Sequence, residues 1–235
     1  MLGLALIAHE KGAVVSGSDI IENNNTAILN ECGIQTFSGH SESFLPYNRA
    51  PFLNKKDCIV VYSSAVKPDN PELATALTDG VKTYRRGSFL AEIAKSFKTV
   101  ISVAGSHGKT TVTSMIAYAL LKAGLNPGFY IGGIPSGWQR NASAGAGEVL
   151  VAEADESDLS LTEIDSSLAI ALNLDNDHAW NVGGIEKLYG GFARFAARSE
   201  KFLPGSSDFP DGFLEGLRKT GICFLERLST NLPNM

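Results

Sequence analysis

Short runs of β-branched and apolar residues alternate along the chain with segments long enough for helices, from the first residue to about residue 203. This alternation is typical of successive βαβ units, whose strands lie mostly parallel in one sheet. The sequence therefore predicts an α/β fold. In the first part, helices are predicted at residues 1–11, 26–31, 71–78 and 88–97, and strands at residues 13–15, 34–37, 58–62 and 81–84.

A second series of units begins with a predicted strand at residues 99–104, so a domain boundary is expected near Lys98. We expect one domain at residues 1–98 and a second at residues 99–235. Beyond Leu203 the sequence becomes rich in proline, glycine and serine and then weakly periodic, so no element is predicted and the tail from about residue 204 is atypical. The second series continues with a helix that ends at Ala123, strands at residues 129–131, 149–152 and 168–174, and a helix at residues 185–198.

Composition and charge restrict the class of protein. The 235 residues are 44% hydrophobic and 19% charged, which is typical of a packed chain rather than a disordered one. The net charge of −5 provides no overall positive field for nucleic acid or for an anionic membrane. The apolar runs are strand-sized and no signal peptide is recognisable, so we expect a cytoplasmic protein without membrane insertion. The three widely spaced cysteines fit neither a disulfide framework nor a zinc site.

A glycine-rich turn joins the predicted strand at residues 99–104 to the helix that follows. Backbone N–H groups and the helix dipole converge at such a turn and bind anions, while Lys109 adds a positive charge and Thr110 a hydroxyl for magnesium. The general pattern has a glycine where this chain has Val103, so the loop is a shortened variant. A polar turn without a ligand is the alternative, but the setting favours a phosphate site. The candidate nucleotide-binding residues are Gly105, Ser106, His107, Gly108, Lys109, Thr110 and Thr111.

Four carboxylates, Glu153, Asp155, Glu156 and Asp158, follow the predicted strand at residues 149–152. Ligands of open α/β sheets bind at the carboxyl ends of the strands, and oxygen ligands beside a phosphate loop suit magnesium. A solvated acidic turn is the alternative. The next strand ends in Asn-Leu-Asp-Asn-Asp-His, whose His178 is either a metal ligand or an ordinary loop histidine.

Polar residues also end two predicted strands of the first part, Asp19 after one and Ser63 and Ser64 after another. Both strand ends would face the crevice of a nucleotide-binding sheet, where an acidic residue accepts hydrogen bonds from a ribose. Ordinary turn residues are the alternative. No strand with a Gly-x-Gly-x-x-Gly turn precedes the first helix.

Together these motifs resemble those of the Mur ligases, the ATP-dependent enzymes that build the peptide of peptidoglycan. The resemblance covers about residues 1–203 and implies a Rossmann-like N-terminal domain that binds the UDP end of the substrate, followed by part of a P-loop-type, parallel-sheet domain that binds ATP. The segments that carry it are Val-Ser-Gly-Ser-Asp at 15–19, Val-Tyr-Ser-Ser-Ala-Val at 61–66, Asp-Asn-Pro at 69–71, Ala-Gly-Ser-His-Gly-Lys-Thr-Thr at 104–111, Ile-Gly-Gly at 131–133, Asn-Ala at 141–142 with Gly145 and Gly147, Val-Ala-Glu-Ala-Asp-Glu-Ser-Asp at 151–158, and Asp-Asn-Asp-His at 175–178.

The resemblance also implies a reaction. ATP phosphorylates the lactyl carboxylate of UDP-N-acetylmuramate, and the amine of L-alanine attacks the acyl phosphate to give an amide, ADP and phosphate. By the matching motifs, the catalytic residues are Lys109 on the β and γ phosphates, Glu153, which with Thr110 binds one Mg²⁺, and His178, which binds a second. The residues implied at the UDP site are Asp19, Ser63 and Ser64. Three further matching positions without a distinct role are His107, Asp155 and Glu156.

The chain also departs from the family pattern. The first strand and its glycine-rich turn are absent, which would leave the edges of the neighbouring strands unpaired, and the sequence after Leu203 no longer resembles the family. From these departures we expect a fragment without the domain for the incoming amino acid, unable to complete ligation. Two alternatives stay open, a sister ligase that attaches a recycled murein tripeptide to the same sugar nucleotide and a non-catalytic nucleotide-binding module. An NAD-dependent dehydrogenase is disfavoured, because Gly-Lys-Thr and the acidic cluster have no role in hydride transfer.

Overall fold

The structure, a computed structural model, describes residues 1–50, 52–175, 179–205, 209–210 and 212–225. Its strands are β1 (Ser16–Asp19), β2 (Gln35–Ser38), β3 (Ile59–Tyr62), β4 (Lys82–Arg85), β5 (Thr99–Ala104), β6 (Gly128–Tyr130), β7 (Ala142–Ser143), β8 (Val149–Glu153), β9 (Ser166–Ala171) and β10 (Ser199–Pro204). Its α-helices are α1 (Leu2–Glu10), α2 (Asn24–Glu31), α3 (Pro46–Arg49), α4 (Pro71–Thr78), α5 (Arg86–Ala94), α6 (Lys109–Lys122), α7 (Ala179–Val182), α8 (Ile185–Ala197) and α9 (Phe213–Arg218). The short 3-10 helices are η1 (Glu42–Phe44), η2 (Lys55–Asp57) and η3 (Ser160–Thr162).

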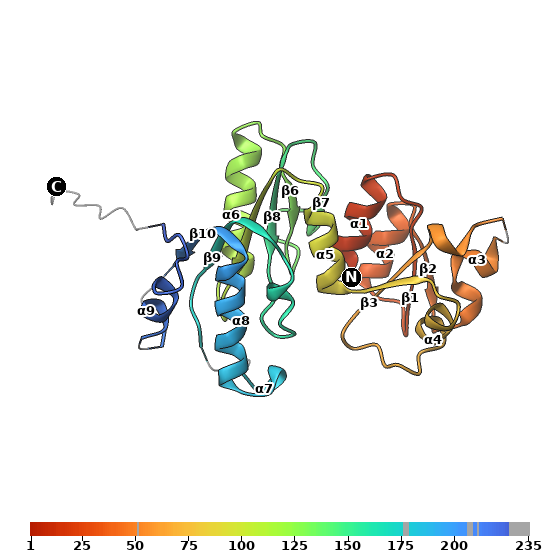
Figure 1. The fold of residues 1–235 in the computed structure, drawn as a ribbon. Helices are drawn as coiled ribbons and strands as arrows, with labels where there is room; N and C mark the ends of the chain where they lie inside the picture. Colours follow the sequence, from red (N-terminus) through yellow and green to blue (C-terminus); the bar gives the residue numbers. More distant parts are fainter. Residues whose placement is uncertain (51, 176–178, 206–208, 211, 226–235) are drawn as a thin grey trace.

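The centre of the molecule is a six-stranded sheet with the order β10-β9-β5-β8-β6-β7. All neighbouring strands in it are parallel except β6 and β7. Figure 1 shows this sheet in the middle of the molecule, with the residues of β1 to β4 to its right and α9 to its left. The predicted α/β fold with a mostly parallel sheet is confirmed.

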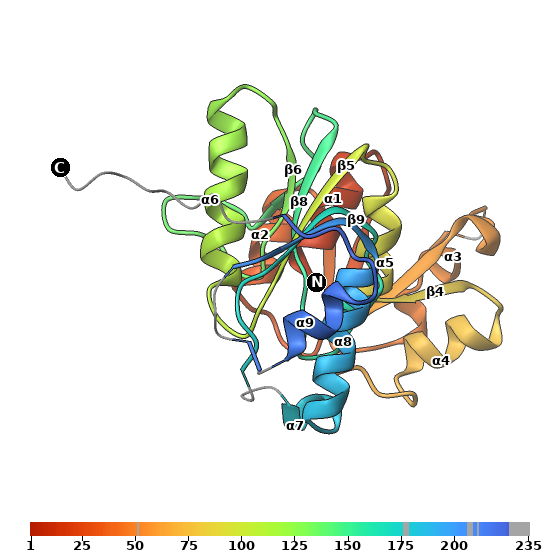
Figure 2. The same cartoon turned by 60° about the vertical axis from the view of Figure 1, so that its left-hand side comes forward.

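Helices cover both faces of the central sheet, and alternate residues of β8 divide the core between them. Val151 packs with Ala117 of α6 on one face, whereas Leu150 shares the other face with Phe192 and Phe195 of α8. This division follows from the strand period of two, which turns successive side chains to opposite faces. Figure 2 shows α6 and α8 on opposite sides of the strands.

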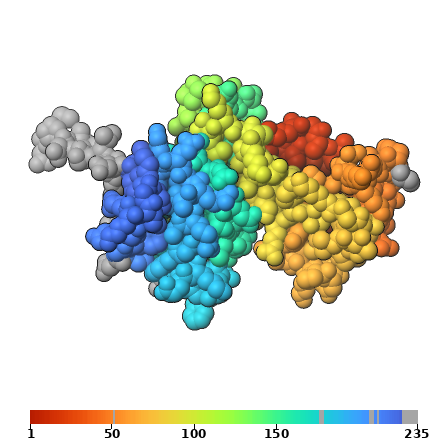
Figure 3. Space-filling view, viewed as in Figure 1, coloured from red at the N-terminus to blue at the C-terminus, as the bar shows by residue number. Residues whose placement is uncertain are grey.

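The first 98 residues are built differently. Their four strands form two separate parallel pairs, β1 with β2 and β3 with β4, and no residue of these strands is buried. Two of their helices instead add Leu4 and Ile7 of α1 and Leu90 and Ile93 of α5 to the core of the central sheet. Figure 3 shows the yellow part of the chain, which includes α5, between the orange residues and the green and teal ones. The hydrophobic core therefore crosses the predicted boundary at Lys98.

Helix ends of the first part follow from local sequence. The Asn23 side chain caps α2 and forms a capping box with Thr26. Asn70 caps α4, Pro71 occupies its first turn, and Gly80 follows its end with φ of +69°. These signals explain why α4 has the predicted bounds.

Several segments differ from the sequence prediction, and three of them are informative. The strand predicted at residues 13–15 is wrong: β1 begins at Ser16, which pairs with the first residue of β2, so the preceding residues have no partner strand. The strand predicted to end at Leu174 ends as β9 at Ala171, beside the start of the glycine-rich turn. The C-terminal residues, for which no element is predicted, extend the sheet: helix α9 follows β10, and Phe224 then forms a parallel bridge with Phe202 of β10.

Among the described residues, no helix is both long and apolar enough to cross a membrane. All three cysteines have free thiols; Cys223 is exposed, and Cys32 and Cys58 are partly buried.

Candidate nucleotide-binding site

The strands β5, β8 and β9 end together at one edge of the central sheet. The last paired residues are Val103 with Glu153 and Ala104 with Ala171, and residues 105–108 connect this edge to α6. The predicted strand–loop–helix arrangement is therefore present, and the acidic residues after β8 lie next to it.

Two glycines give the turn its shape. Gly105 and Gly108 have φ of +148° and +83°, a region that residues with a Cβ rarely adopt. A Cβ on Gly105 would also lie 3.0 Å from the Cβ of Leu172. The backbone thus requires glycine at both positions, and Val103, where the general pattern has glycine, is a fully buried residue of β5.

Lys109, the first residue of α6, lies inside this turn. Its Nζ donates to the carbonyl oxygen of Gly105 at 2.6 Å and to Oε1 of Glu156 at 2.7 Å. The Glu156 side chain is 1% exposed and that of Lys109 is 14% exposed. Because a buried carboxylate is costly without a partner, the pair fixes both charges where the phosphates of a nucleotide would arrive. Glu156, which had no predicted role of its own, therefore positions Lys109.

The Thr110 hydroxyl donates to Oε2 of Glu153 at 3.1 Å, and the same oxygen accepts from the backbone N–H of Gly132 at 2.8 Å. The two predicted magnesium ligands are thus adjacent. A hydroxyl and a carboxylate are hard oxygen donors, and Mg²⁺ bound to nucleotides takes one or two carboxylates besides phosphate oxygens and water. Thr110 and Glu153 therefore fit that ion. The described residues contain no cluster of three or more His, Cys, Asp and Glu side chains suited to a metal.

The segment after β9 is fixed against the glycine-rich turn. Asn173 Oδ1 accepts from the N–H of His107 at 2.9 Å, and Asn173 Nδ2 donates to the His107 carbonyl at 3.1 Å. The Ser106 hydroxyl oxygen accepts from the N–H of Asp175 at 2.9 Å. Sequence reasoning missed these contacts, because Asn173 is 66 positions from its partner and only the fold brings them together. His178, the predicted second metal ligand, lies outside the described residues.

The predicted UDP-site residues end strands of two different sheets. Asp19 Oδ1 accepts from the N–H of Ile20 at 2.8 Å, and the Ser63 hydroxyl oxygen accepts from the N–H of Ala65 at 3.1 Å. Ser64 is exposed. Within the described part of the chain, no hydrogen bond joins Asp19 to either serine, so these residues are positioned by their own turns.

A polar cluster that sequence reasoning missed links β1 to helix α4. The Ser18 hydroxyl donates to Oε1 of Glu72 at 2.6 Å, and His40 Nδ1 lies 3.1 Å from the Ser18 oxygen and 3.2 Å from Glu72 Oε1. The Ser18 hydroxyl and the Glu72 carboxylate both contact Nδ1 of His40. In the serine–histidine–carboxylate relay of a hydrolase they would contact opposite nitrogens of the ring, so this group is not such a relay. Ser18 lies in a recognised motif, but its contact with α4 is not evident from the sequence.

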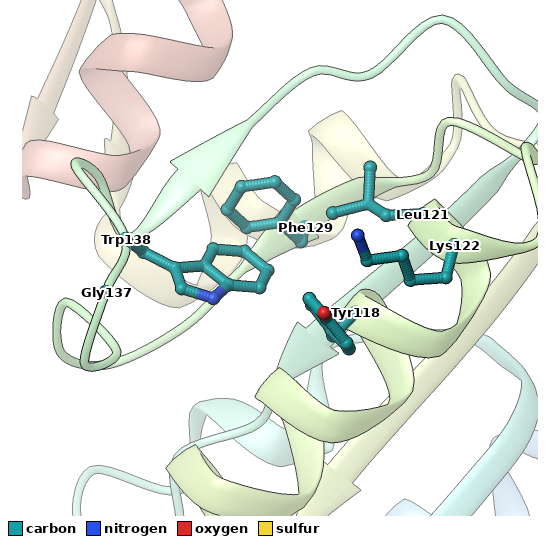
Figure 4. A pocket seen from close by; sticks show the side chains of 6 residues that line it. All are labelled: Tyr118, Leu121, Lys122, Phe129, Gly137 and Trp138. Carbon is teal, nitrogen blue, oxygen red and sulfur yellow. The ribbon is translucent and has the colours of Figure 1, made fainter.

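A cavity of about 380 Å³ lies elsewhere, along the C-terminal half of α6. Figure 4 shows its lining, with Trp138, Phe129 and Tyr118 around it and Lys122 at one side. At about 1.5 Å per helical residue, Lys122 is about 20 Å along the helix from Lys109. The cavity is therefore separate from the candidate site.

Comparison with known proteins agrees with the geometry. Residues 1–98 match the model of the Mur ligase family, catalytic domain. Over 195 residues the chain is 44% identical to the UDP-N-acetylmuramate–L-alanine ligase of Aquifex aeolicus (strain VF5), covering 83% of this chain and 41% of that protein. Over 199 residues it is 42% identical to the enzyme of that name from Bdellovibrio bacteriovorus, covering 84% and 42%. The chain thus spans about two fifths of the length of these curated relatives.

Two solved structures resemble most of this chain. The UDP-N-acetylmuramate:L-alanyl-γ-D-glutamyl-meso-diaminopimelate ligase of Neisseria meningitides has a TM-score of 0.79 at 26% identity, covering 95% of this chain and 72% of that one. The UDP-N-acetylmuramate–alanine ligase of Thermotoga maritima has a TM-score of 0.74 at 29% identity, covering 92% and 49%.

The sheet, the glycine-rich turn and the paired lysine define an α/β protein with a P-loop-type strand–turn–helix arrangement. With the sequence matches, the likeness becomes specific: over most of its length the chain is similar to members of the Mur ligase family.

Proposed function

We propose that this chain is the UDP-substrate-binding and ATP-binding part of a ligase that joins L-alanine to UDP-N-acetylmuramate in peptidoglycan precursor synthesis. The observation that carries the proposal is the pairing of Lys109 with Glu156 and of Thr110 with Glu153 at one sheet edge. The relatives that are more than 40% identical bear the name of that reaction. In this proposal residues 1–98 bind the UDP end and residues 99–235 bind ATP, and the chain is cytoplasmic because both nucleotides are.

The candidate site supplies the electrostatic requirements of phosphoryl transfer, where charge neutralisation and positioning provide most of the catalysis. Lys109 neutralises the β and γ phosphates and keeps its contact with the turn. Thr110 and Glu153 hold one Mg²⁺, and His178 a second. When bound, Mg²⁺ neutralises phosphate oxygens and holds them in place. The carboxylate of the sugar nucleotide would then take the γ-phosphoryl group of ATP and release ADP. The amine of L-alanine would attack the resulting acyl phosphate and form the amide, with loss of phosphate and a proton.

The substrate half of the proposal rests on Asp19, Ser63 and Ser64. Asp19 would accept hydrogen bonds from the ribose of the UDP group, and the two serines would line the same site. Each lies at the carboxyl end of a parallel strand, the edge at which open α/β sheets bind nucleotides.

A second candidate is a ligase that attaches a murein tripeptide to the same sugar nucleotide. It is favoured by the TM-score of 0.79 with an enzyme whose name describes that reaction. Its sequence identity of 26% is below the 44% with the alanine ligase of Aquifex aeolicus, so we give it second place.

The test of the nucleotide site is titration calorimetry of the 235-residue chain with ATP and Mg²⁺. Lys109→Ala should weaken binding by about 100-fold, equivalent to about 2.7 kcal/mol. The matched control is Lys122→Ala, at the other end of the same helix, which should leave affinity unchanged. Since Lys109→Ala removes a partner of the buried Glu156, the double variant Lys109→Ala/Glu156→Gln repeats the test without the uncompensated carboxylate. Equal affinity of the wild type and both Lys109 variants would contradict the assignment.

The substrates are tested by the same method. UDP-N-acetylmuramate should bind the wild type, and Asp19→Asn should weaken that binding by about 10-fold, about 1.4 kcal/mol. Binding of ATP without any binding of UDP-N-acetylmuramate would favour a nucleotide-binding module.

A further inference from the structure

The four carboxylates of the acidic segment, residues 153–158, divide between two sets of partners. Glu153 and Glu156 contact Thr110 and Lys109 at the phosphate turn, as described above. The other two, Asp155 and Asp158, both contact Arg86, the first residue of α5. Residues of the segment thus point in two directions, two toward the nucleotide site and two toward the N-terminal part of the chain.

Arg86 is a single bridge for both aspartates. Its Nη2 lies 2.6 Å from Oδ2 of Asp155 and 2.8 Å from Oδ2 of Asp158. The three side chains are only 22% to 27% exposed, so water screens these charges less than those of surface pairs. Burial by itself raises the pKa of Asp155, but hydrogen bonds from Arg86 and Ser157 outweigh it and hold that pKa below its usual value. The contact with Arg86 therefore favours the charged carboxylate.

The position of Arg86 is set by the close approach of two backbones. A Cβ on the adjacent Gly87 would lie 2.2 Å from the Cβ of Ser160, the first residue of η3. Only glycine allows the start of α5 to come this near to the end of the acidic segment. The Ser160 N–H in turn donates to Oδ1 of Asp158 at 3.0 Å. The fold thus places the arginine against the segment through contacts on both sides.

We propose that Arg86 is a positioning residue of the nucleotide site, whose single positive charge offsets part of the negative charge of Asp155 and Asp158 and which orients the acidic segment so that Glu153 and Glu156 face the phosphate turn. This inference rests on the proposed nucleotide function. Without the arginine, two uncompensated carboxylates would stand beside the site of a triphosphate, and like charges repel across such short ranges. Since Arg86 begins α5, it also connects the site to the half of the chain proposed to bind the sugar nucleotide.

The first experiment compares Arg86→Met with Arg140→Met by calorimetry with ATP and Mg²⁺. Arg140 also joins the two halves of the chain, with its Nη1 2.5 Å from Oε1 of Glu10, but it does not contact the acidic segment. Arg86→Met should weaken binding at least 10-fold, and the loss should shrink at high salt because the repulsion is screened. Arg140→Met should change affinity less than twofold. Arg86→Lys, which keeps the charge, should recover part of the affinity.

The second experiment separates electrostatic positioning from a general structural role. In Arg86→Met/Asp155→Asn/Asp158→Asn, both the arginine and the charges that it neutralises are removed, and affinity should return to within about threefold of the wild type. If the arginine had only a structural role, removing the charges of its partners would not restore the affinity for ATP. Circular dichroism of every variant checks that the chain has folded. If Arg86→Met does not fold, the comparison is made with Arg86→Lys instead.

The outcomes are distinct. If the wild type binds ATP and Arg86→Met binds it equally well, the inference is wrong and the proposed function stands. If Arg86→Met weakens binding but the triple variant does not recover it, Arg86 acts through the fold and not through charge. If the wild type itself fails to bind ATP with Mg²⁺, both the proposed function and this inference are contradicted.

Discussion

The central sheet and the strands of the N-terminal part share one chain and one fold class but are stabilised in different ways. Most residues of β5, β8 and β9 are buried, and helices cover both faces. The strands β1 to β4 form isolated pairs without a single buried residue. Two-stranded sheets are marginal on their own in water. The N-terminal part therefore depends on its attachment to the central sheet, through the core contacts of α1 and α5 and through the ion pairs of Glu10 and Arg86.

The largest expected effect compares two phenylalanines. Phe192 of α8 is fully buried in the central core. Phe37 of β2 is partly exposed and stacks on Phe44, with 4.6 Å between the two ring centroids. Phe192→Ala should lower the free energy of unfolding by about 3–5 kcal/mol, and Phe37→Ala by about 1 kcal/mol. Urea unfolding followed by circular dichroism measures both. Equal losses would break the comparison between the two regions.

Hydrogen exchange sharpens the same comparison. Amides of β5 and β8 should exchange through global unfolding, while those of β1 and β3 should exchange orders of magnitude faster through local opening. Equal protection of the two sets would mean that the isolated strand pairs are as stable as the central sheet.

The next effect concerns the close approach that joins the two regions. Gly87→Ala places a Cβ against Ser160 and should cost about 1–3 kcal/mol, as overpacking usually does. Gly17→Ala is the matched control, because a Cβ at Gly17 meets no atom within 4 Å. Ser160→Gly in the Gly87→Ala background should recover part of the loss in urea unfolding. A Gly87→Ala protein as stable as the wild type would show that the helix can move away freely.

The sequence predicts the secondary structure of the central sheet better than that of the N-terminal part. In the central sheet, apolar runs such as residues 99–104 coincide with strands because burial on both faces demands hydrophobic residues. In the N-terminal part, β1 is the polar stretch Ser-Gly-Ser-Asp and not the apolar stretch before it, because pairing with β2 determines its extent. Polarity patterns carry little information on a strand that is nowhere buried.

Some contacts of the candidate site could be predicted from the sequence and others could not. Lys109, Thr110 and Glu153 could be predicted to meet, because a turn motif and a strand end specify their places. Arg86 and Asn173 could not, because their partners are more than 60 positions away and lie on other elements. Contacts of this kind depend on the packing of the two regions, which no local pattern encodes.

A smaller loss of stability is expected from a substitution of Glu10, the last residue of α1. Its two oxygens accept from Arg140 Nη1 at 2.5 Å, the Ser143 hydroxyl at 2.8 Å and the Ala144 N–H at 2.6 Å. Glu10→Gln removes the charge but keeps the shape, and should cost about 1 kcal/mol. Faster hydrogen exchange in α1 and β7 would accompany the loss. Glu31→Gln, an exposed glutamate at the end of α2, is the control and should leave both measurements unchanged.

The smallest expected effect is a pH dependence at the contact between Arg86 and Asp155. The pKa of Asp155 in the folded chain lies below its ordinary value of 3.8, because hydrogen bonds from Arg86 and Ser157 outweigh the opposing effect of burial. An acid with a lowered folded pKa contributes stability that is complete above the unfolded pKa and is lost as the pH falls through the folded one. The difference in unfolding free energy between wild type and Asp155→Asn should therefore be constant above about pH 5 and shrink below it.

The size of this difference should stay near or below about 1 kcal/mol, since the pair is partly exposed. Urea midpoints measured between pH 5 and pH 3 give the curve for each variant. In the Arg86→Met background, Asp155→Asn should change the acid dependence far less, because the main source of the lowered pKa is gone. A wild-type curve that ran parallel to that of Asp155→Asn down to pH 3 would show that this contact does not couple the two regions through charge.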